Sequence, residues 1–367
     1  MTAEFMPVTT PGDCTLVALQ EADERAWDHL IGTLDGNFKH SFAWSRWSEK
    51  RSGPPAYFTI EKAGQPVAAG WYLVSSPALS GRRIKQALFE TLPCFDRQRI
   101  SASEVFAEVM SLARREKWIA FSFGNSSPEY LTGAEACDVT EKISFRIDLS
   151  GSLKQIFSKF RDTHRKRIRR AEKGPLKFRI LTDGQALAYA GALEELFQYT
   201  FERHVSRGKE RERPAATSIG DGIRDLVLTG QAILFVALDG EEPVCFNLAS
   251  SFPGKAQGMF LASSARGYEL NASYLVMVRM IEYFRDRGYP YLDIGEVPRS
   301  AENEDDPDHG LYQYKTGYAA DTALLCSGTV ILRPGVNRVV TRLARGKTAI
   351  AHLLRLASGT LKNPSVR

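Results

Sequence analysis

The sequence has no long hydrophobic run and few cysteines. No stretch approaches 18 consecutive apolar residues, so no transmembrane helix is predicted. Residues 1–13 carry two acids and no basic residue, unlike a secretory signal peptide, so the predicted location is the cytoplasm. The five cysteines lie at least 43 residues apart without Cys-x-x-Cys spacing. This spacing argues against a disulfide framework or a zinc knuckle and predicts small, buried side chains.

Several catalytic signatures are also absent. The six histidines are scattered, and no His or carboxylate cluster has the spacing of metal ligands, so no metal site is predicted. Neither a Gly-x-Ser-x-Gly elbow nor a Walker phosphate loop occurs. The sequence therefore does not favour a hydrolase or an ATPase.

Acidic residues are missing from the end of the chain. Residues 333–367 hold eight Lys or Arg and no acid. Since the whole chain has a formal net charge of +5, residues 1–332 carry a net charge of −3. Apolar residues recur at helical spacing between Val336 and Ala357, and this predicts a basic amphipathic tail over 335–367. Three roles stay open for this tail: packing against the body, covering a dimer interface, or binding an anionic membrane surface.

What the sequence does contain is an internal repeat. Residues 56–76 and 232–252 both read as two apolar strands joined by a tight turn, the second turn at Asp239-Gly240. Residues 104–124 and 275–295 both read as an amphipathic helix, a basic turn and a short strand that ends in glycine. The offsets of the two matches, 176 and 171 residues, are nearly equal. This order and spacing predict a tandem duplication.

Each copy reads as helices and short strands in alternation, so the predicted fold is α/β, built of α+β layers with mixed sheets. The predicted domains are 1–148 and 149–334, followed by the basic tail 335–367. The boundary falls where a strand ends, and Ser150 or Ser152 can cap the next helix.

The segment after this boundary is strongly basic. Apolar residues and His164 fall at helical spacing between Leu153 and Lys173, which predicts one amphipathic helix. Its other faces carry six net positive charges over residues 159–173. Such a helix is either a solvated face or a binding surface for a phosphate-bearing substrate. For the second case, the candidate substrate-binding residues are Arg161, Arg165 and Arg169.

Three segments occur in the order seen in a known family. They read FSKFRDTHRKRIRRAEK, SYLVMVRMIEYFRDRGYPYLDIGE and GLYQYKTGYAAD. In this respect the chain resembles the Fem-type and related acetyltransferase-like proteins of the GNAT superfamily, most strongly over residues 145–330. The resemblance implies tandem GNAT-like domains that transfer an acyl or aminoacyl group to an amine or hydroxyl. It also suggests an acceptor on a cell-envelope precursor or polysaccharide unit.

The resemblance implies a donor site as well. The acetyl-CoA signature of simple GNAT enzymes is present only in part, because Asn271 and Ala272 replace its second glycine. A pyrophosphate would bind at the start of the following helix. The candidate donor-binding residues are Arg266, Gly267, Asn271, Ala272 and Ser273.

Two donor substrates stay open. Fem-type enzymes use aminoacyl-tRNA, but the coiled-coil arm of their second domain is absent from this chain. The missing arm favours an acyl thioester, acyl-CoA, and tRNA is a partner only if the donor is aminoacyl-tRNA.

The catalytic candidates lie near the end of the second copy. Acyl transfer needs a neutral amine, a polarised carbonyl and a stabilised oxyanion. In the resembled family, the Tyr-Lys-x-Gly-Tyr segment lies close to the reaction centre, which implies a charge-stabilising role for Lys315 with Tyr314 beside it. Asp293 and Glu296 end the preceding strand and are candidate bases or partners of nearby cations. The acidic segment 301–308 is either a solvated loop or a lid for a cationic acceptor.

We therefore predict a tandem GNAT-fold acyltransferase with a small-molecule or lipid-linked acceptor. We expect it in the cytoplasm or at the inner face of the membrane, and a homo-oligomer is compatible with the sequence. The alternative is a catalytically inactive binding or scaffold module, which the incomplete donor signature would explain.

Overall fold

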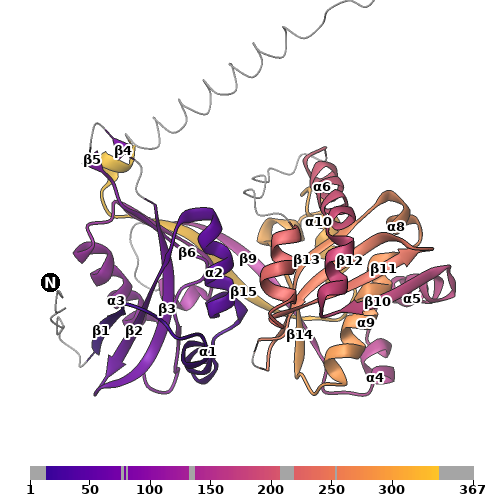
Figure 1. The fold of residues 1–367 in the computed structure, drawn as a ribbon, viewed down its shortest axis with the longest axis horizontal. Helices are drawn as coiled ribbons and strands as arrows, with labels where there is room; N and C mark the ends of the chain where they lie inside the picture. The colour runs from indigo at the N-terminus through magenta and orange to yellow at the C-terminus, as the bar shows by residue number, and fades with distance from the viewer. Residues whose placement is uncertain are drawn as a thin grey trace, which may run out of the picture.

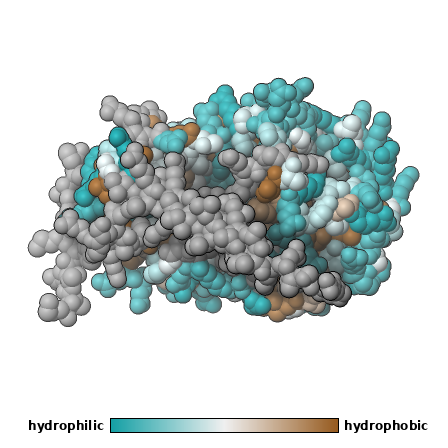
Figure 2. Space-filling view, turned by 90° about the horizontal axis from the view of Figure 1, so that it is seen from above, coloured by the Kyte–Doolittle hydropathy of each residue, from teal (hydrophilic) through white to brown (hydrophobic). Residues whose placement is uncertain are grey.

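The computed structural model describes residues 14–75, 78–79, 82–131, 137–206, 219–252 and 254–338. Within these ranges, 13 strands form one mixed sheet with helices packed on it (Figure 1). Hydrophilic residues cover most of the described surface visible in Figure 2. None of the described helices is both long and apolar enough to cross a membrane. The predicted tail lies outside the described residues from position 339 onward.

The two halves contain the following elements. The first half contains β1 (Cys14–Leu19), α1 (Glu24–Thr33), η1 (Phe38–His40), α2 (Phe42–Ser52), β2 (Pro55–Lys62), β3 (Gln65–Ser75), β4 (Ala78–Leu79), β5 (Arg82–Arg83), β6 (Gln86–Phe89), β7 (Cys94–Phe95), α3 (Ala102–Arg115), β8 (Ala120–Ser126), η2 (Pro128–Leu131) and β9 (Cys137–Asp148). The second half contains α4 (Leu153–Ser158), α5 (Asp162–Lys173), β10 (Leu176–Leu181), η3 (Gly184–Tyr189), α6 (Ala190–Ser206), α7 (Ile219–Gly222), η4 (Ile223–Val227), β11 (Ala232–Asp239), β12 (Glu242–Ser250), β13 (Ala256–Ser263), α8 (Ala265–Glu269), α9 (Ala272–Arg285), β14 (Tyr291–Pro298), η5 (Arg299–Glu302), α10 (His309–Thr316) and β15 (Asp321–Ile331).

The strand order has the same pattern when read from either edge of the sheet. It is β1-β2-β3-β6-β8-β15-β9-β14-β13-β12-β11-β10, so each strand of the first half in this order has a counterpart at the mirrored position. β7 pairs with β3 beside this path, and β4 and β5 pair with each other in a separate sheet. The two parallel pairs, β6–β8 and β13–β14, are also counterparts. The strands thus repeat at the segments where the sequence repeats.

The last strand of each half lies beside the other half. β9 pairs with β14, β15 pairs with β8, and β9 and β15 pair with each other in the middle of the sheet (Figure 1). The sheet is therefore continuous across residue 148.

Helices bury apolar residues on both faces of this sheet. On one face, α3 packs against strands of the first half and α9 against strands of the second. On the opposite face, α1, α2, α6 and η4 share one core, in which the rings of Trp47 and Phe260 lie 6.0 Å apart. Four cysteines, Cys14, Cys94, Cys245 and Cys326, are buried, as the sequence predicts. The halves are thus joined by a shared core as well as by the sheet.

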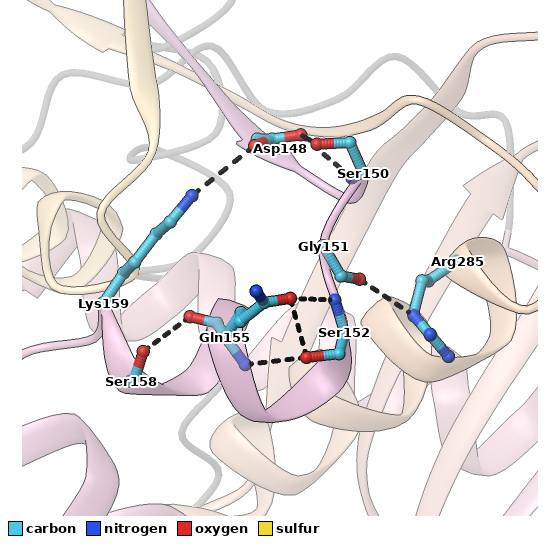
Figure 3. Close-up of polar contacts among 8 residues, drawn as sticks. All are labelled: Asp148, Ser150, Gly151, Ser152, Gln155, Ser158, Lys159 and Arg285. Atoms are coloured by element: carbon cyan, nitrogen blue, oxygen red, sulfur yellow. Dashed lines mark hydrogen bonds and ion pairs between the residues drawn. The ribbon is translucent and has the colours of Figure 1, made fainter.

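Local capping fixes the start of the second half (Figure 3). Ser152 caps α4 in a capping box, with the Gln155 side chain accepting from the Ser152 N–H at 2.8 Å. Ser150 instead donates its hydroxyl to Asp148 at 2.6 Å. Arg285, at the end of α9, donates to the carbonyl that precedes Ser152 at 3.1 Å. Of the two predicted caps, Ser152 is therefore the one that starts the helix.

The prediction of one continuous helix from Leu153 to Lys173 is wrong. The chain leaves the helical path at Arg161, which has a ψ of 147° and donates its N–H to the carbonyl of Gly317 at 2.9 Å. The neighbouring Phe160 is 2% exposed, with its ring 5.2 Å from that of Tyr318. Because both contacts require the chain to turn, tertiary packing overrides the helical pattern.

Both predicted hairpins form, but the second turn is displaced by one residue. It comprises Gly240 and Glu241 rather than Asp239 and Gly240, and Gly240 has a φ of +65°. A positive φ favours glycine at this position. In both hairpins the register shifts just before the turn, so the two repeats also share this irregularity.

Candidate functional site

The parallel strands of the second half separate soon after they meet. β13 and β14 pair at only two positions, ending with Gln257 and Asp293, whereas their counterparts β6 and β8 pair at four. A bulge at Met259 of β13 and another between Asp293 and Glu296 of β14 accompany the separation. Bulges commonly lie next to active sites, where they redirect backbone groups. We define the site around this opening.

Lys315 contacts β14 just beyond its last pairing with β13 at Asp293. It comes from α10, is 7% exposed, and donates from Nζ to the carbonyls of Ile294 and Glu296 at 2.8 and 3.2 Å. Gly295 between them has a φ of +82°, and a Cβ there would lie 3.2 Å from the ammonium nitrogen. The ammonium also lies 5.8 Å from the ring centroid of Phe145. The glycine bulge therefore turns two carbonyls of β14 toward a buried positive charge.

Glu296 is a carboxylate that is held by cations. Its Oε1 accepts a hydrogen bond from the Asn125 amide at 2.6 Å. Burial would raise the pKa of Glu296, but the ammonium groups of Lys39, Lys142 and Lys315 outweigh burial and lower the pKa to about 2. Glu296 is therefore a fixed negative charge at neutral pH and is poorly suited to accept a proton.

Asp293 has the opposite character. Burial raises the pKa of its carboxyl group, although the Gly295 N–H donates to it at 2.7 Å and Arg146 lies 3.7 Å away. Ser144 also donates to it at 3.3 Å. A raised pKa brings a carboxylate closer to the value that suits a general base. Of the two predicted bases, the geometry and charge favour Asp293.

A cavity of about 770 Å³ lies between the halves and includes Asp293 in its wall. Three ion pairs line it: Arg97 with Glu129, Lys255 with Asp35, and Arg146 with Asp293. Aromatic and polar residues complete the wall, including Phe38, Phe95, Tyr130, Tyr291 and Asn125. The lining charges balance one another, so the cavity suits a polar acceptor without a large net charge.

His164 joins the segments that carry the family resemblance. Its ring is 5% exposed, donates from Nε2 to the carbonyl of Tyr314 at 2.8 Å, and packs edge-on against Tyr274 and Tyr318. Burial lowers the pKa of His164, which keeps the imidazole neutral. A Cβ at Gly317 would lie 1.9 Å from the ring. The glycine of the Tyr-Lys-x-Gly-Tyr segment thus makes room for His164.

Tyr314 faces the start of α9 rather than solvent. Its hydroxyl donates to the carbonyl of Ser273 at 3.3 Å, and its ring lies edge-on to Tyr274 at 5.2 Å. Burial raises the pKa of Tyr314, so the phenol is neutral at physiological pH. These contacts make Tyr314 a link between α10 and α9, directly before Lys315.

The first two predicted donor-binding residues take part in packing contacts. Arg266 forms ion pairs with Asp239 at 2.8 Å and with Glu269 at 3.2 Å. Gly267 is buried, and a Cβ there would lie 2.2 Å from the carbonyl oxygen of Val244. Close packing of α8 against β12 therefore explains this glycine without a phosphate.

The other three predicted donor-binding residues form the start of α9. Asn271 has a φ of +56° and gives no side-chain cap, and Ala272 and Ser273 begin the helix. The counterpart helix α3 starts differently, with a capping box between Ser101 and Glu104. The Glu104 carboxylate therefore accepts from the backbone N–H of Ser101 at the start of α3. No side chain caps the start of α9, which leaves its N–H groups without such an acceptor from the N-cap residue.

The three predicted arginines of the basic segment have different surroundings. Arg161 donates to the side chain of Gln313, Arg165 donates to the carbonyl of Ser158 at 2.6 Å and pairs with Asp162, and Arg169 is exposed.

Sequence reasoning missed Arg167, which approaches α9. Its guanidinium donates to the Tyr274 hydroxyl at 2.6 Å and lies 5.3 Å from that ring. Arg167 therefore brings a positive charge to the first turn of α9. Arg167 follows the buried His164 by three residues, so the two side chains are neighbours on the helix surface. This spacing is the signal in the sequence that could have identified Arg167.

The comparisons define the class of the second half. Residues 158–316 match the family model described as the acetyltransferase (GNAT) domain, and this segment contains β13, β14, α9 and α10. The second half thus carries a GNAT-superfamily acetyltransferase domain, which confirms the resemblance seen in the sequence.

Solved structures extend the similarity over most of the chain. FemX superposes with a TM-score of 0.68 at 12% identity, covering 88% of this chain and 99% of its own. L-PGS from Bacillus licheniformis gives 0.55 at 13% identity, covering 88% and 96%. A tandem GNAT protein from the clavulanic acid biosynthesis pathway gives 0.50 at 12% identity, covering 87% and 98%. These likenesses show the mixed α/β fold with one large sheet. No curated protein matches the chain in sequence.

Proposed function

We propose that this protein is an acyltransferase that moves an acyl or aminoacyl group to an amine or hydroxyl acceptor. The observation that carries the proposal is the opening between β13 and β14, with the buried Lys315 ammonium beside it and the uncapped start of α9 after β13. The GNAT match of this segment supports the same reaction class. In this proposal, residues 1–148 and 149–334 are two GNAT-like domains and the second is catalytic.

Lys315 stabilises the charge that develops on the acyl carbonyl. When the acceptor attacks, the carbonyl oxygen becomes an oxyanion, and a fixed positive charge in a shielded site stabilises it. Two backbone carbonyls hold the ammonium in place, so its position does not depend on the ligand. Because Lys315 is buried, water competes less with the oxyanion for contact with its ammonium group.

Asp293 takes the proton from the acceptor, which enters from the cavity between the halves. The acceptor nitrogen or oxygen forms a bond to the acyl carbon and its proton passes to Asp293. The bond to the leaving group then breaks, releasing a thiolate from acyl-CoA, or a ribose alkoxide of tRNA that takes the proton from Asp293 and leaves as a hydroxyl. The position of Asp293 in the cavity wall and its raised pKa support this role.

The first turn of α9, with Arg167 beside it, binds a phosphate of the donor. The N–H groups at a helix N-terminus and a nearby guanidinium both favour an anion. This feature suits acyl-CoA and aminoacyl-tRNA alike, so the donor class is decided by experiment. Envelope precursors and lipid-linked acceptors remain the proposed acceptors, with a location in the cytoplasm or at the inner face of the membrane.

A donor comparison tests this function. Purified protein is incubated with acetyl-CoA or longer acyl-CoA and a mixed amine pool, and free thiol is measured; aminoacyl-tRNA with a labelled aminoacyl group is tested in parallel. Acceptor-dependent release from one donor class supports the proposal. If neither donor reacts and neither coenzyme A nor aminoacyl-tRNA shifts the melting temperature, a scaffold role is favoured, which the packing roles of Arg266 and Gly267 would suit.

A further inference from the structure

Asn125 and Glu296 occupy equivalent places in the two repeats and bond to each other. Each directly follows the glycine, Gly124 or Gly295, that ends the repeated helix–strand segment, and the two residues are 171 positions apart. The amide nitrogen of Asn125 donates to the Glu296 carboxylate at 2.6 Å. Both lie at bulges, because the register shifts near Asn125 in the β8–β15 pair and near Glu296 in the β14–β9 pair. The bond therefore connects the two repeats at matching irregularities.

We propose that Asn125, although it belongs to the first half, is a positioning residue of the reaction site in the second half. This inference rests on the proposed function, since it adds a residue to that site. Asn125 holds the side chain of Glu296, and the backbone carbonyl of Glu296 accepts from the Lys315 ammonium at 3.2 Å. A shift of Glu296 would therefore move one of the two anchors of Lys315.

An amide suits this position because both of its ends are used. While the nitrogen of Asn125 donates to Glu296, its oxygen accepts from the ammonium of Lys142 at 3.1 Å. The charged groups that act on Glu296 are Lys39 of η1, Lys142 of β9, Lys315 of α10 and Asp293 of β14. A neutral amide bridges a cation and an anion without changing this balance, and a carboxylate at the same place would repel Glu296.

Asn125 also faces the acceptor side of the site. It lines the cavity between the halves together with Asp293. One residue thus contacts the space for the acceptor and the strand that holds Lys315. The first half would then contribute a positioning residue to the reaction site, in addition to its share of the fold.

The test compares Asn125→Ala and Asn125→Asp with the control Ser122→Ala. Ser122 lies on the same strand and bonds Thr329 across the β8–β15 pair at 2.9 Å, so its loss also removes a contact between the halves. We expect Asn125→Ala to lower kcat by up to about 100-fold through misplacement, with little change in the acceptor KM. Ser122→Ala should keep the wild-type kcat.

Asn125→Asp changes the pH profile of kcat only if Asn125 acts on the reaction site, and not if its role is merely structural. Two carboxyl groups at hydrogen-bond distance share a proton in acid and repel when both ionise. At acidic pH, we expect the kcat of Asn125→Asp to be close to that of the wild type at the same pH. As pH rises, the kcat of the variant should fall, giving a descending limb that the wild type lacks. Circular dichroism should show that the variant remains folded. Equal kcat values for Asn125→Ala and Ser122→Ala, or a wild-type pH profile for Asn125→Asp, would overturn the proposal.

Failure of the proposed function is recognised separately. It is seen when the wild-type protein itself transfers no acyl group from either donor. In that case, the carbon-13 carboxyl signal of Glu296 is titrated in wild type and Asn125→Ala. An unchanged titration shows that Asn125 does not control Glu296 and overturns the inference, whereas a raised pKa in the variant supports its positioning part.

Discussion

The imidazole of His164 occupies the space that a side chain at residue 317 would need. A Cβ at Gly317 would lie 1.9 Å from the ring, and the ring donates to the carbonyl of Tyr314 at 2.8 Å. The basic helix α5 is thereby fixed against α10, whose next residue after Tyr314 is Lys315. Two motifs that lie about 150 residues apart in the chain form one packed unit beside the site.

Gly317→Ala should destabilise the protein. The added methyl overlaps a buried ring, and overpacking of this kind costs typically about 1–3 kcal/mol of unfolding free energy. Gly310, within α10, is the matched control, because a Cβ there meets nothing within 4 Å. Gly310→Ala should be neutral or slightly stabilising, since alanine favours a helix. Urea denaturation measures both, and equal stability of the two variants would contradict the packing argument.

Lys315→Ala should lower the rate of transfer while the protein stays folded. Loss of one stabilising donor at an oxyanion costs on the order of 10²–10³-fold in rate. The variant also leaves the carbonyls of Ile294 and Glu296 without this donor, so a modest fall in melting temperature is expected. Lys177→Ala, at an exposed ion pair, is the control and should keep the wild-type rate. Unchanged turnover in Lys315→Ala would remove Lys315 from the reaction.

The rate of transfer should rise with pH through the raised pKa of Asp293. Burial favours the protonated carboxyl, and only the ionised form can accept a proton from the acceptor. Asp293→Asn should abolish this ascending limb and slow transfer by about 10²–10⁴-fold. The pH profile of kcat/KM measures the limb, and Asp138→Asn at an exposed position is the control. A profile unaffected by Asp293→Asn would exclude Asp293 as the base.

Glu296 should stabilise the fold in a pH-dependent manner. Its pKa is lowered from 4.5 to about 2, so the ionised group contributes stability above the ordinary value, and this contribution is lost as pH falls toward 2. Glu296→Gln should therefore reduce the unfolding free energy at neutral pH, and the difference from wild type should shrink in acid. Denaturation curves at several pH values measure this difference. A difference that stays constant with pH would contradict the proposed charge cluster.

The basic tail offers a test of membrane association. Full-length protein and a chain truncated after Pro334 are compared by co-sedimentation with anionic vesicles at about 0.15 M salt, where the screening length is near 8 Å. If the tail binds the membrane surface, only the full-length protein should sediment. Equal partitioning of both chains, or none, would leave packing on the body or a dimer contact as its role.

Local patterns predicted the elements well. The hairpins, the cap at Ser152 and the helix–strand repeats depend on turn chemistry and periodicity, which are visible in sequence. The break at Arg161 depends on a bond to Gly317 and could not be seen locally.

The candidate site could be inferred from the sequence only in part, for the same physical reason. Lys315 and Asp293 could be selected from the resemblance and from their place at a strand end. Asn125, the cavity, and the approach of Arg167 to Tyr274 depend on strands and helices that meet from distant parts of the chain. Long-range contacts of this kind leave no period or spacing in the sequence.

The most direct test of the central claim is a single-turnover transfer assay with a labelled acyl or aminoacyl group. Wild type and Lys315→Ala are each mixed with acyl-CoA or aminoacyl-tRNA and a pool of amine and hydroxyl acceptors, and labelled acceptors are identified by mass spectrometry. Our account predicts that the wild type transfers label from one donor class and that the variant does so about 10²–10³-fold more slowly. Absence of labelled acceptor with both donors, or equal rates for the two proteins, would contradict acyl transfer at the β13–β14 opening.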